Sequence, residues 1–348
     1  MDSKKDLENQ MKEINLNSSF THFENIKSKY ILKLIFDYLN EKKCFDIIKY
    51  TKKIQQTINK NSSDYKKLLE IEIEIMIDKN KMHFEKNNFI NINEKDRKYY
   101  HIYFDDNKEE AKRKDLAINK DEKVSKINII IDYQIKSLQH LFACCYCIIS
   151  INFKKFYRNN IINMNRLFGE NHSLKEINLS NFNTSNVTDM SEMFLGCYSL
   201  KEINLSKFNT NNVKNMSDMF KRCTSIKKLN LSNFNTNNVT HMKSMFDACS
   251  SLERLNLSNF NTNNVVTMEE MFSGCVSLKE LNLSNFKTLN TKNMKKMFFQ
   301  CKSLIKLNLT NFNFDNVIFI ESMFKLCSFN LIMKIKKKFK CIKEKAFK

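Results

Sequence analysis

The sequence predicts an α/β solenoid, in which the chain winds through successive coils of constant length, preceded by a smaller helical or mixed domain. Two observations predict this fold. A phrase that begins Leu174-Lys-Glu-Ile177-Asn-Leu179 restarts five times, each time 26 residues later and without insertions. Each phrase also joins a strand-like apolar pattern to a helix-like one. Because neither half buries its apolar side alone, stacked copies must supply a shared core.

The first half of each phrase is expected to be a strand. Leu174, Ile177 and Leu179 end in the alternation of apolar and polar residues that is typical of a half-buried strand. Strands at the same point of every coil would pair in parallel. The sequence therefore predicts one parallel sheet along the inner face of the solenoid.

The second half of each phrase is expected to be a short helix on the outer face. Val187, Met190, Phe194 and Cys197 are separated by three, four and three residues, which places them on one side of a helix. Polar pairs such as Ser185-Asn186 precede this segment, and such side chains commonly cap a helix N-terminus.

The pattern divides the chain into four parts. Residues 1–20 are polar and expected to be disordered, and residues 21–123 are expected to form the helical or mixed domain. Residues 124–329 are expected to form eight coils, of which the first two are degenerate, as terminal repeats often are. Residues 330–348 are expected to form a basic C-terminal cap.

Side chains that recur at the same point of each coil are expected to stack in the core. For the cysteines, packing as small buried side chains is favoured. Disulfides between adjacent coils are geometrically conceivable, but eleven cysteines are an odd number, and zinc needs ligands that converge on a point rather than a line. No metal or other cofactor is predicted. The expected core ladder consists of Phe182, Phe208, Phe234, Phe260, Phe286, Phe312, Cys197, Cys223, Cys249, Cys275, Cys301 and Cys327.

Polar columns on the strands are the candidate binding site. One interpretation is a broad face for an extended protein partner; the other is a hydrogen-bonded ladder that only satisfies the polar groups of the sheet. The charged column favours binding more than the Asn and Ser columns do, because its residues vary while the others repeat. The expected partner-binding residues are Glu176, Asn178, Ser180, Glu202, Asn204, Ser206, Lys228, Asn230, Ser232, Arg254, Asn256, Ser258, Glu280, Asn282, Ser284, Lys306 and Asn308.

The phrase Leu-x-x-Leu-x-Leu-Ser-x-Phe-x-Thr-x-x-Val-x-x-Met-x-x-Met-Phe-x-x-Cys-x-Ser resembles the 26-residue repeat of BspA-type leucine-rich surface proteins. The resemblance implies a right-handed leucine-rich-repeat coil, with the parallel sheet inside and short helices outside. It also implies binding to a protein or a matrix, often at a cell surface. The sequence departs from surface members, because no signal peptide, lipid-anchor cysteine or wall anchor is expected.

Residues 26–59 resemble an F-box, because a helix ending in Tyr38-Leu39 is followed by a second helix with a Lys-rich end. The usual Leu-Pro opening and the Trp of a third helix are absent. The resemblance implies that a Skp1-type ligase subunit binds this segment. The alternative is an ordinary helical cap on the solenoid. Residues 60–123 suggest no specific structure.

The formal charge of +20 is attributed mainly to compositional bias and solubility. The Lys-rich segment 331–348 is expected to be a solvated cap rather than a site for nucleic acid or anionic membrane. Three scattered glycines cannot form a phosphate loop, and the six histidines lack metal spacing. The sequence thus predicts a non-enzymatic protein-binding scaffold without a small-molecule substrate, located in the cytoplasm. The alternatives are a ubiquitin-ligase substrate adaptor of the F-box type and a cell-surface adhesin of the BspA type.

Overall fold

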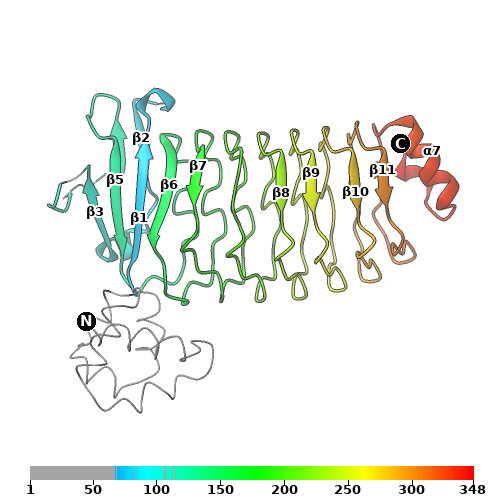
Figure 1. The fold of residues 1–348 in the computed structure, drawn as a ribbon, viewed down its shortest axis with the longest axis horizontal. Helices are drawn as coiled ribbons and strands as arrows, with labels where there is room; N and C mark the ends of the chain where they lie inside the picture. Colours follow the sequence, from blue (N-terminus) through cyan, green and yellow to red (C-terminus); the bar gives the residue numbers. More distant parts are fainter. Residues whose placement is uncertain (1–66, 68, 83, 106, 112, 114) are drawn as a thin grey trace, which may run out of the picture. The chain divides into compact units, whose positions relative to one another are not determined.

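The computed structural model describes residues 67, 69–82, 84–105, 107–111, 113 and 115–348. Glu70–Lys348 form one compact unit, in which coils follow one another along a single axis (Figure 1). The disorder predicted for residues 1–20 and the F-box-like segment 26–59 lie outside the described residues.

A column of parallel bridges runs along one side of the stack. Isolated β-bridges join Ser137 to Asn163 and continue in steps of 26 residues as far as Phe319. These bridging residues stand at the spacing expected for eight stacked coils, and they include the two degenerate coils. The chain is mostly strand and turn, in agreement with the predicted repeat solenoid.

The strand column is made of short pieces rather than one long sheet. Strands β8 and β9 pair in parallel, as do β10 and β11, and equivalent residues of successive coils are aligned, for example Leu229 with Leu255. Residues 202–204 have no assigned strand, so the column is interrupted there. The strands are β7 (Glu176–Asn178), β8 (Lys228–Asn230), β9 (Arg254–Asn256), β10 (Glu280–Asn282) and β11 (Lys306–Asn308).

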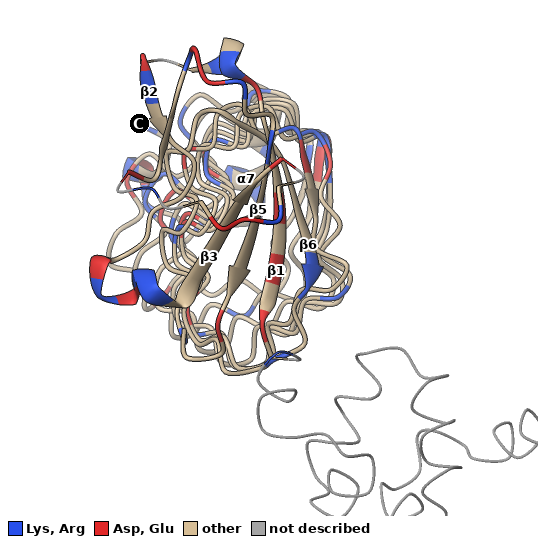
Figure 2. Ribbon diagram, turned by 90° about the vertical axis from the view of Figure 1, so that its left-hand side faces the viewer, with Lys and Arg blue, Asp and Glu red and all other residues tan. Residues whose placement is uncertain are grey.

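A five-stranded sheet forms the N-terminal end of the unit, and Figure 2 shows its strands β3, β5, β1 and β6 side by side. β1 pairs in antiparallel fashion with β5 on one side and with β6 on the other, and β6 continues in parallel to β7. Residues on both sides of the expected domain boundary at 123/124 therefore share one sheet. The order is β3 (Tyr100–Phe104), β5 (Lys126–Ile131), β1 (Ile71–Ile77), β6 (Ile148–Lys155) and β7.

The alternating Ile-Glu sequence of β1 explains its place in this sheet. Ile71, Ile73 and Ile75 are buried, whereas the residues between them are half-buried on the opposite face. Shorter elements complete this end and the C-terminus. These are η1 (Lys79–Lys81), η2 (Glu94–Tyr99), the antiparallel pair β2 (Lys86–Asn88) and β4 (Ala117–Asn119), and η3 (Glu344–Ala346).

The outer half of each coil is a series of turns, so the prediction of short helices there was wrong. The Glu192 N–H donates to the Ser217 carbonyl of the next coil at 2.9 Å, whereas the Leu195 N–H turns back to the Glu192 carbonyl at 3.1 Å. In a helix, every such bond would stay within the segment. Glu192 and Gly196 also have φ values of +56° and +66°, which end each turn before a helix can form.

The predicted N-cap role of the Asn/Ser pairs was wrong for the same reason. Asn186 has no helix to cap, and its Nδ2 donates to the carbonyl of Asn159 in the preceding coil at 2.9 Å. The apolar residues at spacings of three and four still point inward, because each turn returns them to the core side.

Two rows of phenylalanine rings run through the core. Phe182 stacks on Phe208 with ring centroids 5.5 Å apart, and Phe194 stacks on Phe220 at 5.6 Å. All twelve residues of the expected ladder are buried. The core is thus continuous along the axis of the stack.

Helix α7 (Phe329–Lys338) covers the last coil. Ser328 caps its N-terminus, and Leu331 and Ile335 are buried against the stack. Phe329 and Met333 lie on the other side of the helix and are 74% and 51% exposed. Within the described residues, no helix combines the length and the apolar character that a membrane crossing requires.

Candidate functional site

The Asn residues of the strand column have a structural role in addition to their exposure. The Oδ1 atom of Asn256 accepts a hydrogen bond from the backbone N–H of Ser258 at 3.1 Å, and the same two-residue bond recurs from Asn178 to Asn308. Each Asn thus stabilises the turn that ends its strand. This geometry supports the interpretation of the Asn column as a ladder, although the Asn residues from Asn178 to Asn282 are exposed.

A second ladder, of threonines, lies inside the coils. Thr236 is 1% exposed. Its hydroxyl donates to the Asn261 carbonyl at 2.8 Å and accepts from the Asn261 N–H at 2.7 Å. Equivalent threonines in four other coils make the same pair of bonds, whereas the last regular coil has Phe314 at this position. This column of threonines therefore joins successive coils and offers nothing to a ligand.

The cysteine column is also structural. The Cys223 thiol lies 3.1 Å from the Phe194 carbonyl oxygen, and the same contact recurs along the column to Cys327. Burial raises the pKa of the Cys249 thiol to about 12. Since the thiolate is the nucleophile and the metal ligand, these neutral thiols are poor candidates for either role. All ten described cysteines are free.

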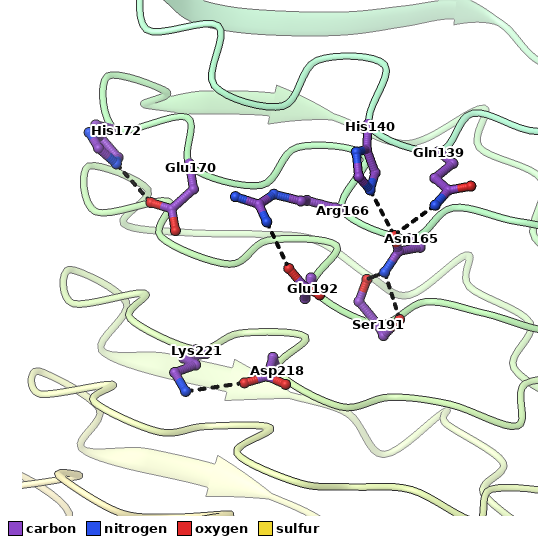
Figure 3. Close-up of polar contacts among 10 residues, drawn as sticks. All are labelled: Gln139, His140, Asn165, Arg166, Glu170, His172, Ser191, Glu192, Asp218 and Lys221. Carbon is purple, nitrogen blue, oxygen red and sulfur yellow. Dashed lines mark hydrogen bonds and ion pairs between the residues drawn. The ribbon is translucent and has the colours of Figure 1, made fainter. Parts of the chain in front are cut away.

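Polar contacts also bridge the first coils on the side of the bridge column (Figure 3). Asn165 accepts from Gln139 at 3.2 Å and donates to the Ser191 hydroxyl at 2.8 Å, and Arg166 pairs with Glu192 at 3.2 Å. His172 pairs with Glu170 at 2.9 Å. The contacts of Asn165 and Arg166 join neighbouring coils, whereas His172 and Glu170 belong to the same coil. Among the described residues, no three His, Cys, Asp or Glu side chains are grouped as metal ligands.

An open groove runs along the strand column, and we call it the strand groove. It consists of three adjoining hollows: the first shares Lys201 and Ile203 with the second, and the second shares Arg254 and Leu255 with the third. The third hollow has a volume of about 1270 Å³ and ends against α7. The groove is lined by Lys175, Glu176, Ile177, Ser199, Lys201, Glu202, Ile203, Asn204, Ser225, Lys227, Lys228, Leu229, Asn230, Ser251, Glu253, Arg254, Leu255, Asn256, Ser277, Lys279, Glu280, Leu281, Asn282, Ser303, Ile305, Lys306, Leu307, Asn308, Leu331, Lys334, Ile335 and Lys338.

The floor and the rim of the strand groove differ in chemistry. The floor is the column of central strand residues, one Ile or Leu per coil, of which Ile203 and Leu255 are half-buried and Leu229 is buried. The rim is charged and exposed. It carries nine Lys and Arg side chains and four Glu side chains, so it has a surplus of positive charge.

The predicted binding residues only partly coincide with this groove. It is lined by the charged column from Glu176 to Lys306 and by the Asn column from Asn204 to Asn308. The remaining predicted residues do not line the groove. They are Asn178, at the end of β7, and the serines that follow the Asn column by two residues, namely Ser180, Ser206, Ser232, Ser258 and Ser284.

Apart from the floor residues, which were expected only as apolar positions of the strands, sequence reasoning missed three sets of lining residues. One is the column that includes Lys201, Lys227 and Lys279, which immediately precedes the charged column. Another is the Ser column that follows each cysteine by two residues, such as Ser225. Both recur every 26 residues and were therefore visible in the repeat. The third set comes from α7, and only the three-dimensional structure brings it to the groove.

Comparison with known proteins gives two likenesses. The family model described as "Mycoplasma protein of unknown function, DUF285" matches residues 136–254 and again 223–335, which together make up more than half of the chain. A search of solved structures finds a leucine-rich repeat protein from Bacteroides ovatus, 21% identical, with a TM-score of 0.40 over 57% of this chain.

The present chain spans 46% of that Bacteroides protein. A search of curated proteins finds no match. The family match begins at the first coil and does not extend to the F-box-like segment 26–59. Because the family model matches more than half of the chain, the chain belongs to the family described as Mycoplasma protein of unknown function, DUF285.

Proposed function

We propose that this chain is a non-enzymatic scaffold that binds a segment of another protein in the strand groove. The observation that carries the proposal is the continuity of the groove, which crosses six coils from Lys175 to Lys306 and ends at α7. A long, shallow groove with an apolar floor and a charged rim fits an extended chain better than a small molecule, which usually binds in a deep concave pocket.

The variation along the groove also supports binding. The residues that join the coils, such as Thr236 and Asn238, recur almost unchanged because each coil needs the same bonds. The charged column instead changes sign along its length, from Glu202 through Lys228 and Arg254 to Glu280. Such a sequence of charges can fix the register and direction of a bound segment.

The chemistry of the described residues favours binding over catalysis. Eight of the ten described cysteines are buried, and burial holds the pKa of thiols such as Cys249 above its ordinary value. The histidines that have partners, such as His172 with Glu170, lie outside the groove. The groove itself offers Lys, Glu, Ser and Asn side chains on an open surface, from which water is not excluded.

Photo-cross-linking tests the proposal with a matched pair of positions. Lys201 lines the groove, whereas Lys214 is exposed half a coil away in the sequence and does not line it. We expect a photoreactive residue at position 201 to cross-link a distinct protein in an extract of the source cells, and one at position 214 not to do so. Equal cross-linking from both positions, or from neither, would contradict the proposal.

A further inference from the structure

The end of the strand groove is formed by two different elements. The strand side supplies Arg254 from β9, Lys279 from just before β10 and Lys306 from β11, and α7 supplies Lys334 and Lys338 from above the last coil. Lys334 and Lys338 are one helical turn apart and lie next to the buried Leu331 and Ile335, so they overhang the hollow. Positive charge therefore approaches this hollow from both the strand side and the helix side.

Most of this positive charge is not neutralised within the described part of the chain. Lys306 pairs with Glu280 at 2.6 Å. By contrast, Arg254, Lys279, Lys334 and Lys338 form no ion pair within the described residues. Besides Glu280, the lining of this hollow contains one acidic residue, Glu253. Elsewhere on the surface, lysines do find acidic partners, as Lys336 does with Glu344.

The floor of the same hollow is apolar. In the floor, Leu255 and Leu307 are half-buried and Leu281 is buried. Beside the floor, the buried Leu331 and Ile335 of α7 and the 49% exposed Ile305 add further apolar side chains. A partner that carries only charge would leave this floor in contact with water. A partner that carries both acidic and apolar side chains would cover the floor and neutralise the rim.

The dimensions of the groove suit an extended peptide. Neighbouring strands are about 4.8 Å apart, so six coils span roughly 24 Å, which an extended segment of about eight residues covers. Alternate residues of an extended segment point in opposite directions. A segment that alternates acidic and apolar residues can therefore place one set on the floor and leave the other within reach of the long Lys and Arg side chains.

We infer that the strand groove selects an extended acidic segment with alternating apolar residues, and that its α7 end is the main electrostatic anchor. This inference rests on the proposed scaffold function and specifies the chemistry of its partner. Arg254 contributes from the strands and is shared by two of the three hollows. Lys334 and Lys338 contribute from the helix.

Fluorescence anisotropy with three synthetic peptides of about eight residues tests the inference on the full chain. The peptides alternate Leu with Glu, with Gln or with Lys. We expect the Glu peptide to bind at least tenfold more tightly than the Gln peptide, and the Lys peptide not to bind. We also expect the preference for Glu to fall as salt is raised, because ions screen exposed charges.

A pair of charge-matched variants locates the site. Lys334→Gln/Lys338→Gln removes the two groove lysines, whereas Lys337→Gln/Lys340→Gln removes two exposed lysines that do not line the groove. We expect the first variant to weaken binding of the Glu peptide about tenfold and the second to change it less than twofold. Arg254→Gln tests the strand side without altering α7, and it should weaken binding in the same way.

The alternative outcomes separate this inference from the scaffold function. Equal binding of the Glu and Gln peptides would overturn the acidic preference, and equal loss in both lysine variants would show only non-specific attraction. Tighter binding of a single-stranded oligonucleotide of equal charge would favour nucleic acid and also overturn it. If no peptide bound, the inference would fail, and cross-linking from position 201 would then decide whether the scaffold function survives.

Discussion

The thiol of Cys249 lies 3.0 Å from the carbonyl oxygen of Phe220 and donates a hydrogen bond to it. The same carbonyl accepts the backbone N–H of Cys223 at 3.0 Å. Each cysteine of the column therefore fills a small buried space and also supports a turn of the preceding coil. In the degenerate second coil, Asn171 stands at the cysteine position and donates to Phe142 at 2.6 Å, so the donor is retained where the sulfur is not.

Replacing Cys249 by Ala and by Ser separates these two roles. We expect Cys249→Ala to lower the free energy of unfolding by about 2 kcal/mol, through the lost hydrogen bond and the lost packing. Cys249→Ser keeps a donor and should cost less than the Ala variant. Urea unfolding followed by circular dichroism measures both. A Ser variant less stable than the Ala variant would indicate that the thiol acts only as an apolar group.

The burial of the cysteine column predicts which thiols react. Among the ten described cysteines, Cys144 and Cys341 are exposed and the others are buried. We expect iodoacetamide to label these two at pH 8 and the buried ones only after unfolding, as measured by peptide mass spectrometry. Rapid labelling of Cys223 or Cys249 in the folded protein would contradict the structure.

The same burial predicts a loss of stability at high pH. Burial raises the pKa values of Cys249 and Cys327 to about 12 in the folded state, whereas an unfolded thiol titrates near its ordinary value of about 9. The unfolded state therefore releases protons first. The contribution of these thiols is fully present below about pH 9 and is lost as the pH rises toward 12. We expect the unfolding free energy to fall in this window, and less steeply in Cys249→Ala.

The threonine ladder predicts a strong effect from a substitution of nearly equal volume. Thr236→Val removes the hydroxyl that donates to the Asn261 carbonyl and accepts from its N–H. We expect a loss of about 2–4 kcal/mol in unfolding free energy, because two backbone groups lose their partner. Thr224 is half-buried and has no side-chain hydrogen bond within the described residues. Thr224→Val is the control and should change stability by less than about 0.5 kcal/mol.

The left-handed residues predict a stabilising substitution. Ala248 has a φ of +56°, and its equivalent one coil later is Gly274 at +68°. Because a left-handed conformation costs an L-residue about 1–2 kcal/mol, Ala248→Gly should stabilise the fold by about 0.5 kcal/mol after the entropic cost of Gly is counted. Ala143 is not among the residues with positive φ, so Ala143→Gly should instead destabilise it. Thermal unfolding of the two variants should therefore shift in opposite directions.

The phenylalanine rows predict the largest loss. Phe234 is 1% exposed and stacks on Phe208 with ring centroids 6.3 Å apart. We expect Phe234→Ala to lower the unfolding free energy by about 3–5 kcal/mol. Phe329 is also a phenylalanine but is 74% exposed, and Phe329→Ala serves as the control. A loss below about 1 kcal/mol at Phe234 would mean that the row is not part of the core.

The repeat could be predicted from the sequence because identical positions in successive coils occupy identical environments. Phe234, Cys249 and Leu252 were placed inside by their phase alone, and all three are buried. The backbone of the outer half could not be predicted in this way. Apolar spacings of three and four fit both a helix and a series of turns, and the hydrogen bonds from Glu192 to the next coil decide between them.

The groove was only partly predictable for a related reason. The strand pattern identified Arg254 and Lys306 as exposed, but not which side of the strand column is hollow. Lys334 and Lys338 join the site because α7 folds back over the last coil, and the repeat contains no equivalent of them. The strand formed by Ile71–Ile77 was missed because its partners, β5 and β6, are distant in the sequence or lie in degenerate coils.

Bonds between neighbouring coils occur around the whole circumference, from the bridge at Asn215 to the strand at Lys228 and the thiol at Cys249. The contacts between the regular coils are therefore closely similar, and removal of one 26-residue unit from among them would bring together two surfaces of the same kind. Such an architecture can lengthen or shorten by whole units while its cross-section stays fixed. Duplication or loss of a unit would change how long a partner the protein accommodates without requiring a new core.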